Sequence, residues 1–115
     1  MAQVREYQIT IPQQAGAFNV DLNILHGITI YDAWVIKTTA AGGAAREVQL
    51  ANQSGSVITD VFNINVADGT VVRAGSIDDA TNTVTAAQGL RAVVDAQAGN
   101  SACILTVLGV PTATP

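Results

Sequence analysis

Hydrophobic and polar residues alternate along most of this chain with a period of two, which is typical of β-strands with one buried face. No segment keeps a helical period for three turns. The clearest strand is ITIYDAWVIKT, where one face is apolar except at Asp32. Its apolar members are Ile28, Ile30, Trp34 and Ile36. Because Trp34 shares this face with three isoleucines, we expect it to be the core aromatic residue.

Seven further runs rich in β-branched residues predict strands, because such side chains suit a pleated surface. The first is REYQITI, which Pro12 ends because proline has no amide hydrogen to donate. The fourth is long, and we expect a bend in it near Thr59 and Asp60. The seven runs cover residues 5–11, 17–22, 46–51, 56–66, 71–75, 90–97 and 101–110.

Short turn signals separate these runs and leave no room for a crossover helix. The sharpest are Asp68-Gly69 and Gly99-Asn100, whose residue types accept a positive φ at low cost. The pattern predicts an all-β fold, an antiparallel β-sandwich that is jelly-roll-like, with about eight strands. We expect a single domain over residues 1–115, in which 1–12 is an N-terminal arm or an edge strand. The stretch 40–45 is expected to be a mobile loop and 111–115 a flexible tail.

From the composition we also expect that a partner covers part of the surface. Hydrophobic residues make up 49% of the chain and charged residues 12%, about half the usual share. The net charge is −4. The cations are too scattered to bind nucleic acid or an anionic membrane surface. They are Arg5, Lys37, Arg46, Arg73 and Arg91.

The single cysteine, Cys103, excludes an intrachain disulfide, and its apolar surroundings predict a buried thiol. The apolar run around it is about half as long as a membrane-spanning helix. The first residues lack the apolar block of a signal peptide. We therefore expect a protein that is made in the cytoplasm and stays there or is released by lysis.

The adjacent carboxylates Asp78 and Asp79 are the most conspicuous candidates for chemistry. Aspartate commonly accepts hydrogen bonds from backbone amides two or three residues on, so we expect the pair to close a turn, with Asp79, which precedes Ala80-Thr81-Asn82, as the acceptor. An ion pair with Arg73 would fix the same connection. Calcium binding together with Asp68 is the alternative, although the spacing is not that of an EF-hand loop.

Other chemistry finds little support in the sequence. His26 is the only histidine, and no nucleophile motif or cysteine partner accompanies it. We therefore predict that the protein is not an enzyme, with no catalytic residues, metal or cofactor. A small hydrolase or metalloprotein built on His26 and two acids remains an alternative. Trp34 would serve a carbohydrate-binding module only if it were exposed.

The order of blocks resembles the head decoration, or capsid cement, proteins of tailed bacteriophages. A tryptophan-containing strand is followed by a Gly/Ala loop, the block ITD…VADGTVVRAGSIDDA and the closing run GLRAVVDAQAGNSACILTVLGV. The similarity spans about residues 28–110. It implies a jelly-roll-like sandwich on the exterior of the virion capsid, commonly a homotrimer, that clamps the major capsid protein.

A cement protein of this kind needs no active site, and partners cover its weakly charged surface. The N-terminal segment offers candidate capsid or subunit contacts. These are Arg5, Glu6, Tyr7, Ile9 and Ile11. The alternatives are a receptor- or carbohydrate-binding module of a phage tail fibre, and another virion part such as a connector or tail-tube component.

Overall fold

The computed structural model describes residues 3–14, 16–39, 46–64, 66–95 and 102–112. These residues form nine strands and no helix. Eight of the strands fall within or next to predicted runs, and the two-residue strand β7 was not predicted. The strands are β1 Arg5–Ile11, β2 Phe18–Leu22, β3 Ile28–Thr39, β4 Glu47–Asn52, β5 Val57–Asn63, β6 Val71–Arg73, β7 Thr83–Val84, β8 Leu90–Val94 and β9 Ala102–Pro111.

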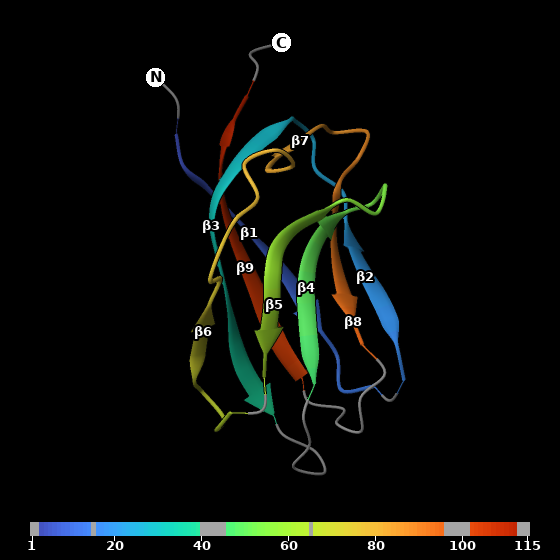
Figure 1. Ribbon diagram of the computed structural model, residues 1–115, viewed down its shortest axis with the longest axis vertical. Helices are drawn as coiled ribbons and strands as arrows, with labels where there is room; N and C mark the ends of the chain where they lie inside the picture. Colours follow the sequence, from blue (N-terminus) through green and yellow to red (C-terminus); the bar gives the residue numbers. More distant parts are fainter. Residues whose placement is uncertain (1–2, 15, 40–45, 65, 96–101, 113–115) are drawn as a thin grey trace.

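The strands form two packed antiparallel sheets (Figure 1). Sheet A has the order β1-β9-β3-β6, with β7 also paired to β3, and sheet B has the order β2-β8-β4-β5. β6 and β7 pair with different parts of β3 and together act as one interrupted strand. Counted in this way, each sheet has four strand positions in the order of a jelly roll. The predicted fold class is confirmed.

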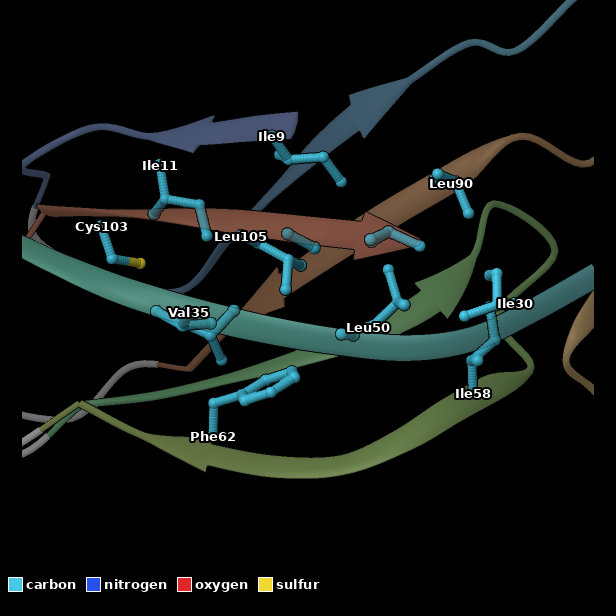
Figure 2. Packing of buried hydrophobic residues seen from close by; sticks show 14 of the residues in the cluster. Ile9, Ile11, Ile30, Val35, Leu50, Ile58, Phe62, Leu90, Cys103 and Leu105 are labelled. Atoms are coloured by element: carbon cyan, nitrogen blue, oxygen red, sulfur yellow. The ribbon is translucent and has the colours of Figure 1, made fainter. Parts of the chain in front are cut away.

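The inner faces of the two sheets enclose one core of branched aliphatic side chains and Phe62 (Figure 2). Ile9 and Ile11 enter this core from β1, with exposed fractions of 2% and 0%. β1 pairs with β9 along its whole length, from Arg5 opposite Gly109 to Ile11 opposite Cys103. Of the two predicted roles for residues 1–12, the described part therefore forms an edge strand of the sandwich.

One extra residue in β3 reverses its pattern of buried side chains. Ile30 lies opposite Gly109 and Asp32 lies opposite Leu108, so Tyr31 is bulged out of the ladder. Such a bulge shifts the alternation by one residue. Ile28 and Ile30 are buried before the bulge, whereas Ala33 and Val35 are buried after it.

The prediction that Trp34 is the core aromatic residue is wrong for this reason. The bulge places Trp34 on the outer face of sheet A together with Asp32 and Ile36, and Trp34 is half-buried there. Asp32 was the signal in the sequence, because an uninterrupted alternation would have placed its carboxylate in the core.

Two local predictions about the chain's bends are confirmed. The ladder between β4 and β5 is irregular where Leu50 lies opposite the segment Ile58 to Asp60, which is the position of the expected bend. In the Asp68-Gly69 turn, Gly69 has a φ of 83°. Such a backbone suits glycine because a Cβ atom would be strained there.

Other predicted features lie partly or wholly outside the described residues. Gly99-Asn100 and the stretch 40–45 fall outside them, as do residues 113–115. The beginning of the expected tail is ordered into sheet A. Pro111 lies opposite Ile28, and the Thr112 amide donates to the Gly27 carbonyl oxygen at 3.0 Å.

The burial pattern of β1 predicts effects of very different size for substitutions at two neighbouring residues. Ile11→Ala leaves a cavity between the sheets and is expected to lower the free energy of unfolding by about 2–5 kcal/mol. Thr10→Ala changes an exposed side chain on the other face and should shift it by no more than about 0.5 kcal/mol. Urea denaturation of both variants measures the difference. Equal, small effects would show that β1 does not belong to the core.

Candidate functional site

The outer face of sheet A is unusually apolar along its two central strands. Because side chains alternate between faces, those of β9 that do not enter the core lie on this surface. They continue across the neighbouring strand, since Ile104 lies opposite Ile36 and Thr106 opposite Trp34. We call this surface the A face. Its side chains are Glu6, Gln8 and Thr10 of β1, Ile104, Thr106, Leu108 and Val110 of β9, Thr29, Asp32, Trp34 and Ile36 of β3, Val71 and Arg73 of β6, and Thr83 of β7.

Trp34 and Arg73 form the most specific contact on the A face. The guanidinium of Arg73 lies over the Trp34 ring, 5.1 Å from its centroid, and its Nη1 donates to Asp32 Oδ2 at 2.9 Å. A guanidinium stacks well on tryptophan and still offers further donors in the plane of its fork. Because the Arg73 side chain is 64% exposed, the ion pair adds about 0–1 kcal/mol to stability.

The predicted ion pair of Arg73 is therefore corrected. Its partner is Asp32, on the adjacent strand, and not Asp78 or Asp79. The register of the sheet explains the difference, because Arg73 lies opposite Trp34 and its side chain reaches the next outward position of β3. Sequence proximity had favoured the local partner.

The corresponding face of sheet B mixes polar residues with exposed valines. Asn19, Val93, Gln49 and Val61 lie on one outward row, in which Val93 is 36% and Val61 44% exposed, and Asp21 pairs with Arg91 on the next. The Arg91 fork donates to both carboxylate oxygens of Asp21, at 2.7 and 3.0 Å. This hydrogen bonding lowers the pKa of Asp21 and raises the pKa of Arg91. The apolar outward residues of sheet B are thus separated by a polar one, whereas on sheet A Ile36 and Ile104 lie side by side.

The five contact residues predicted on the N-terminal segment divide between the two faces of β1. Ile9 and Ile11 are core residues, and Tyr7 packs against the core, so these three do not offer a free contact surface. Glu6 lies on the A face and Arg5 is exposed. The larger apolar part of the A face was not predicted from the sequence, because its residues belong to β9 and to the part of β3 that follows the bulge.

The segment between β6 and β7 crosses from sheet A to the edge of β5. The Asp78 amide donates to the Ile58 carbonyl oxygen at 2.7 Å, and Thr59 pairs with Ile77. The Asp60 carboxylate accepts a hydrogen bond from the Gly75 amide at 3.0 Å. An open groove of about 410 Å³ lies along this crossing. Its lining is Gln49, Val57, Ile58, Thr59, Asp60, Ser76, Ile77 and Asp78.

Asp78 closes a turn at the end of this crossing segment. Its Oδ1 accepts a hydrogen bond from the Ala80 amide at 2.9 Å, and its backbone oxygen accepts from Thr81 at 3.1 Å. This is the hydrogen bonding expected of an aspartate turn. The acceptor is therefore Asp78 and not Asp79, which is exposed. Within the described ranges there is no group of three or more His, Cys, Asp or Glu residues that could hold a metal ion.

The remaining candidate residues are separated from one another. His26 lies in the bend between β2 and β3 and is half-buried. Cys103 is buried as predicted, and desolvation raises the pKa of its thiol to about 12, so the thiol is protonated at neutral pH. No helix in the part of the chain that the structure describes is long and apolar enough to cross a membrane.

Comparisons with protein-family models, curated proteins and solved structures find no match to this chain.

The turn geometry predicts different roles for the two adjacent aspartates. Asp78→Ala removes the acceptor of the Ala80 amide and is expected to lower the free energy of unfolding by about 0.5–1.5 kcal/mol. Asp79→Ala should change it by no more than about 0.5 kcal/mol. Thermal melting with and without calcium compares both variants with the parent. Strong calcium protection of the parent that either variant abolished would show a binding role in place of the turn.

Proposed function

We propose that this protein is a non-enzymatic structural component of a bacteriophage virion that decorates the capsid and stabilises it. The observation that best supports a role in assembly is the A face, where apolar side chains adjoin one another on the outside of the sandwich, whereas Val93 and Val61 on the other outer face are separated by Gln49. Exposed apolar patches of this kind are typical of protein–protein contact surfaces. That the partner is a capsid is inferred from the resemblance to head decoration proteins.

Capsid decoration works through multivalency. Each copy bridges neighbouring capsid subunits through weak contacts, and many copies together raise the resistance of the shell to opening. The protein's partners are then the major capsid protein and other copies of itself. Such a role uses a fold with covered surfaces, for which a jelly roll with one closely packed aliphatic core is well suited.

Binding to phage heads tests this proposal directly. Heads of the parent phage assembled without the protein are expected to bind it saturably in co-sedimentation, and electron microscopy should then show added density at symmetric positions outside the shell. Decorated heads should also withstand higher temperatures before they open. Heads that already carry the protein are the matched control and should bind no more. Empty heads that bind none would contradict capsid decoration.

A second candidate function is a receptor- or carbohydrate-binding module of a tail fibre. The observation that favours it is the position of Trp34 on the A face, outside the core, where the Arg73 guanidinium lies over its ring. Aromatic rings with a neighbouring polar group are suited to bind planar apolar faces of ligands.

Fluorescence distinguishes this second function, because Trp34 is the only tryptophan. A saturable change of its emission on titration with oligosaccharides, at sugar concentrations that leave free tryptophan unchanged, is expected of a binding module. If none of the sugars changes the Trp34 emission, the carbohydrate-binding function is wrong, and this result has no bearing on capsid decoration.

A further inference from the structure

The A face has an apolar centre and polar margins. Its centre is formed by β9 and β3, whose outward residues include Ile104, Leu108 and Ile36. Its margins are β1, with Glu6 and Gln8, and β6, with Arg73. An apolar centre within a polar rim is the usual anatomy of a protein–protein interface. In the described part of the chain no element lies over this centre (Figure 1).

The two margins carry opposite charges that lie at opposite edges of the sheet. Glu6 is on β1, at one end of the order β1-β9-β3-β6, and Arg73 is on β6 at the other end. Glu6 lies opposite Leu108, which lies opposite Asp32, whereas Arg73 lies opposite Trp34. The two charges are therefore offset along the strands by two residues, or about 7 Å. This offset is within reach of an arginine side chain.

We propose that a second copy of this chain docks on the A face, related to the first by a two-fold axis parallel to the strands. This axis places β1 of one copy over β6 of the other, so that Glu6 approaches the partner's Arg73 twice in the same interface. A two-fold axis in the plane of the sheet but perpendicular to the strands would instead place β1 over the partner's β1 and β6 over the partner's β6. Residues of like charge would then face each other. Arg73 already binds Asp32, but its guanidinium has five N–H donors and can serve both carboxylates.

The available area is sufficient for such a pair. Strands β1, β9, β3 and β6 cover roughly 500 Å² of flat sheet at about 3.3 Å per residue and about 4.8 Å between strands. Two copies together thus bury about 1,000 Å², which is the lower limit expected of a biological interface. On the outer face of sheet B the exposed Val93 and Val61 are separated by Gln49, so no comparable apolar centre forms there.

The pairing stands independently of the proposed capsid role, because it depends only on the A face. It differs from the trimer that the resemblance implies, since stacking one face on a copy of itself closes after two copies.

A charge exchange tests the proposal. The parent is expected to have the mass of a dimer in light scattering, and its Trp34 emission should shift to the blue as the concentration rises. Glu6→Arg alone and Arg73→Glu alone each bring like charges together and should weaken self-association about tenfold or more. An equimolar mixture of the two variants pairs opposite charges at both positions and should restore the dimer. A folding defect in either variant would not be rescued by mixing.

A second pair of variants tests the apolar centre. Ile104→Lys on β9 should abolish the dimer, whereas Val93→Lys, on the outer side of central strand β8 in sheet B, should leave it intact. Thermal melting checks that both variants fold. A parent that is a monomer at every concentration, or a trimer, would overturn the pairing, and so would a mixture that fails to associate. If such a monomer or trimer binds phage heads, the proposed capsid role is retained although the pairing is wrong. If the parent is a dimer that does not bind heads, the pairing is retained and the capsid role is wrong.

Discussion

The bulge at Tyr31 is the constraint on which both surfaces of sheet A depend. Before it, the isoleucines of β3 fill the core; after it, Ala33 and Val35 do, and the larger Trp34 and Ile36 are turned outward. A strand without the extra residue would bury Trp34 together with the carboxylate of Asp32, which would have to be desolvated there. The bulge thus keeps a charge out of the core and, as its other result, gives the outer face its apolar centre.

Much of the fold could be predicted from the sequence because alternation and turn residues are local signals. The strands, the end of β1 at Pro12 and the Gly69 turn all follow from residues within a few positions of each other. The order of the sheets depends on pairings such as β1 with β9, which no local signal specifies. The candidate surface was missed for a related reason, since its members come from four strands and depend on a change of register in one of them.

Two cationic side chains, Arg46 and Lys37, are buried in the sandwich, although an alternating pattern would be expected to place charged residues on the surface. Arg46, immediately before β4, is fully buried; its Nη1 and Nη2 donate to the carbonyl oxygens of Gln14 and Gly16, and its guanidinium lies over the Phe18 ring. Lys37 is also buried, and its Nζ donates to the Val66 carbonyl oxygen at 2.6 Å. Each cation satisfies backbone oxygens of a connection between strands, so these residues, although charged, hold loops against the sheets.

The position of β9 has a consequence for how the protein is made. β9 lies between β1 and β3, yet it is the last described strand to leave the ribosome. Until residue 111 has been synthesised, β1 and β3 each present an unpaired edge, and the inner side chains of sheet A have no complete layer to pack in. Pairings this distant in sequence form slowly, and exposed edges of partly folded chains favour aggregation. The nascent chain therefore carries its greatest risk of misassembly shortly before synthesis reaches this strand, and insertion of one strand removes that risk.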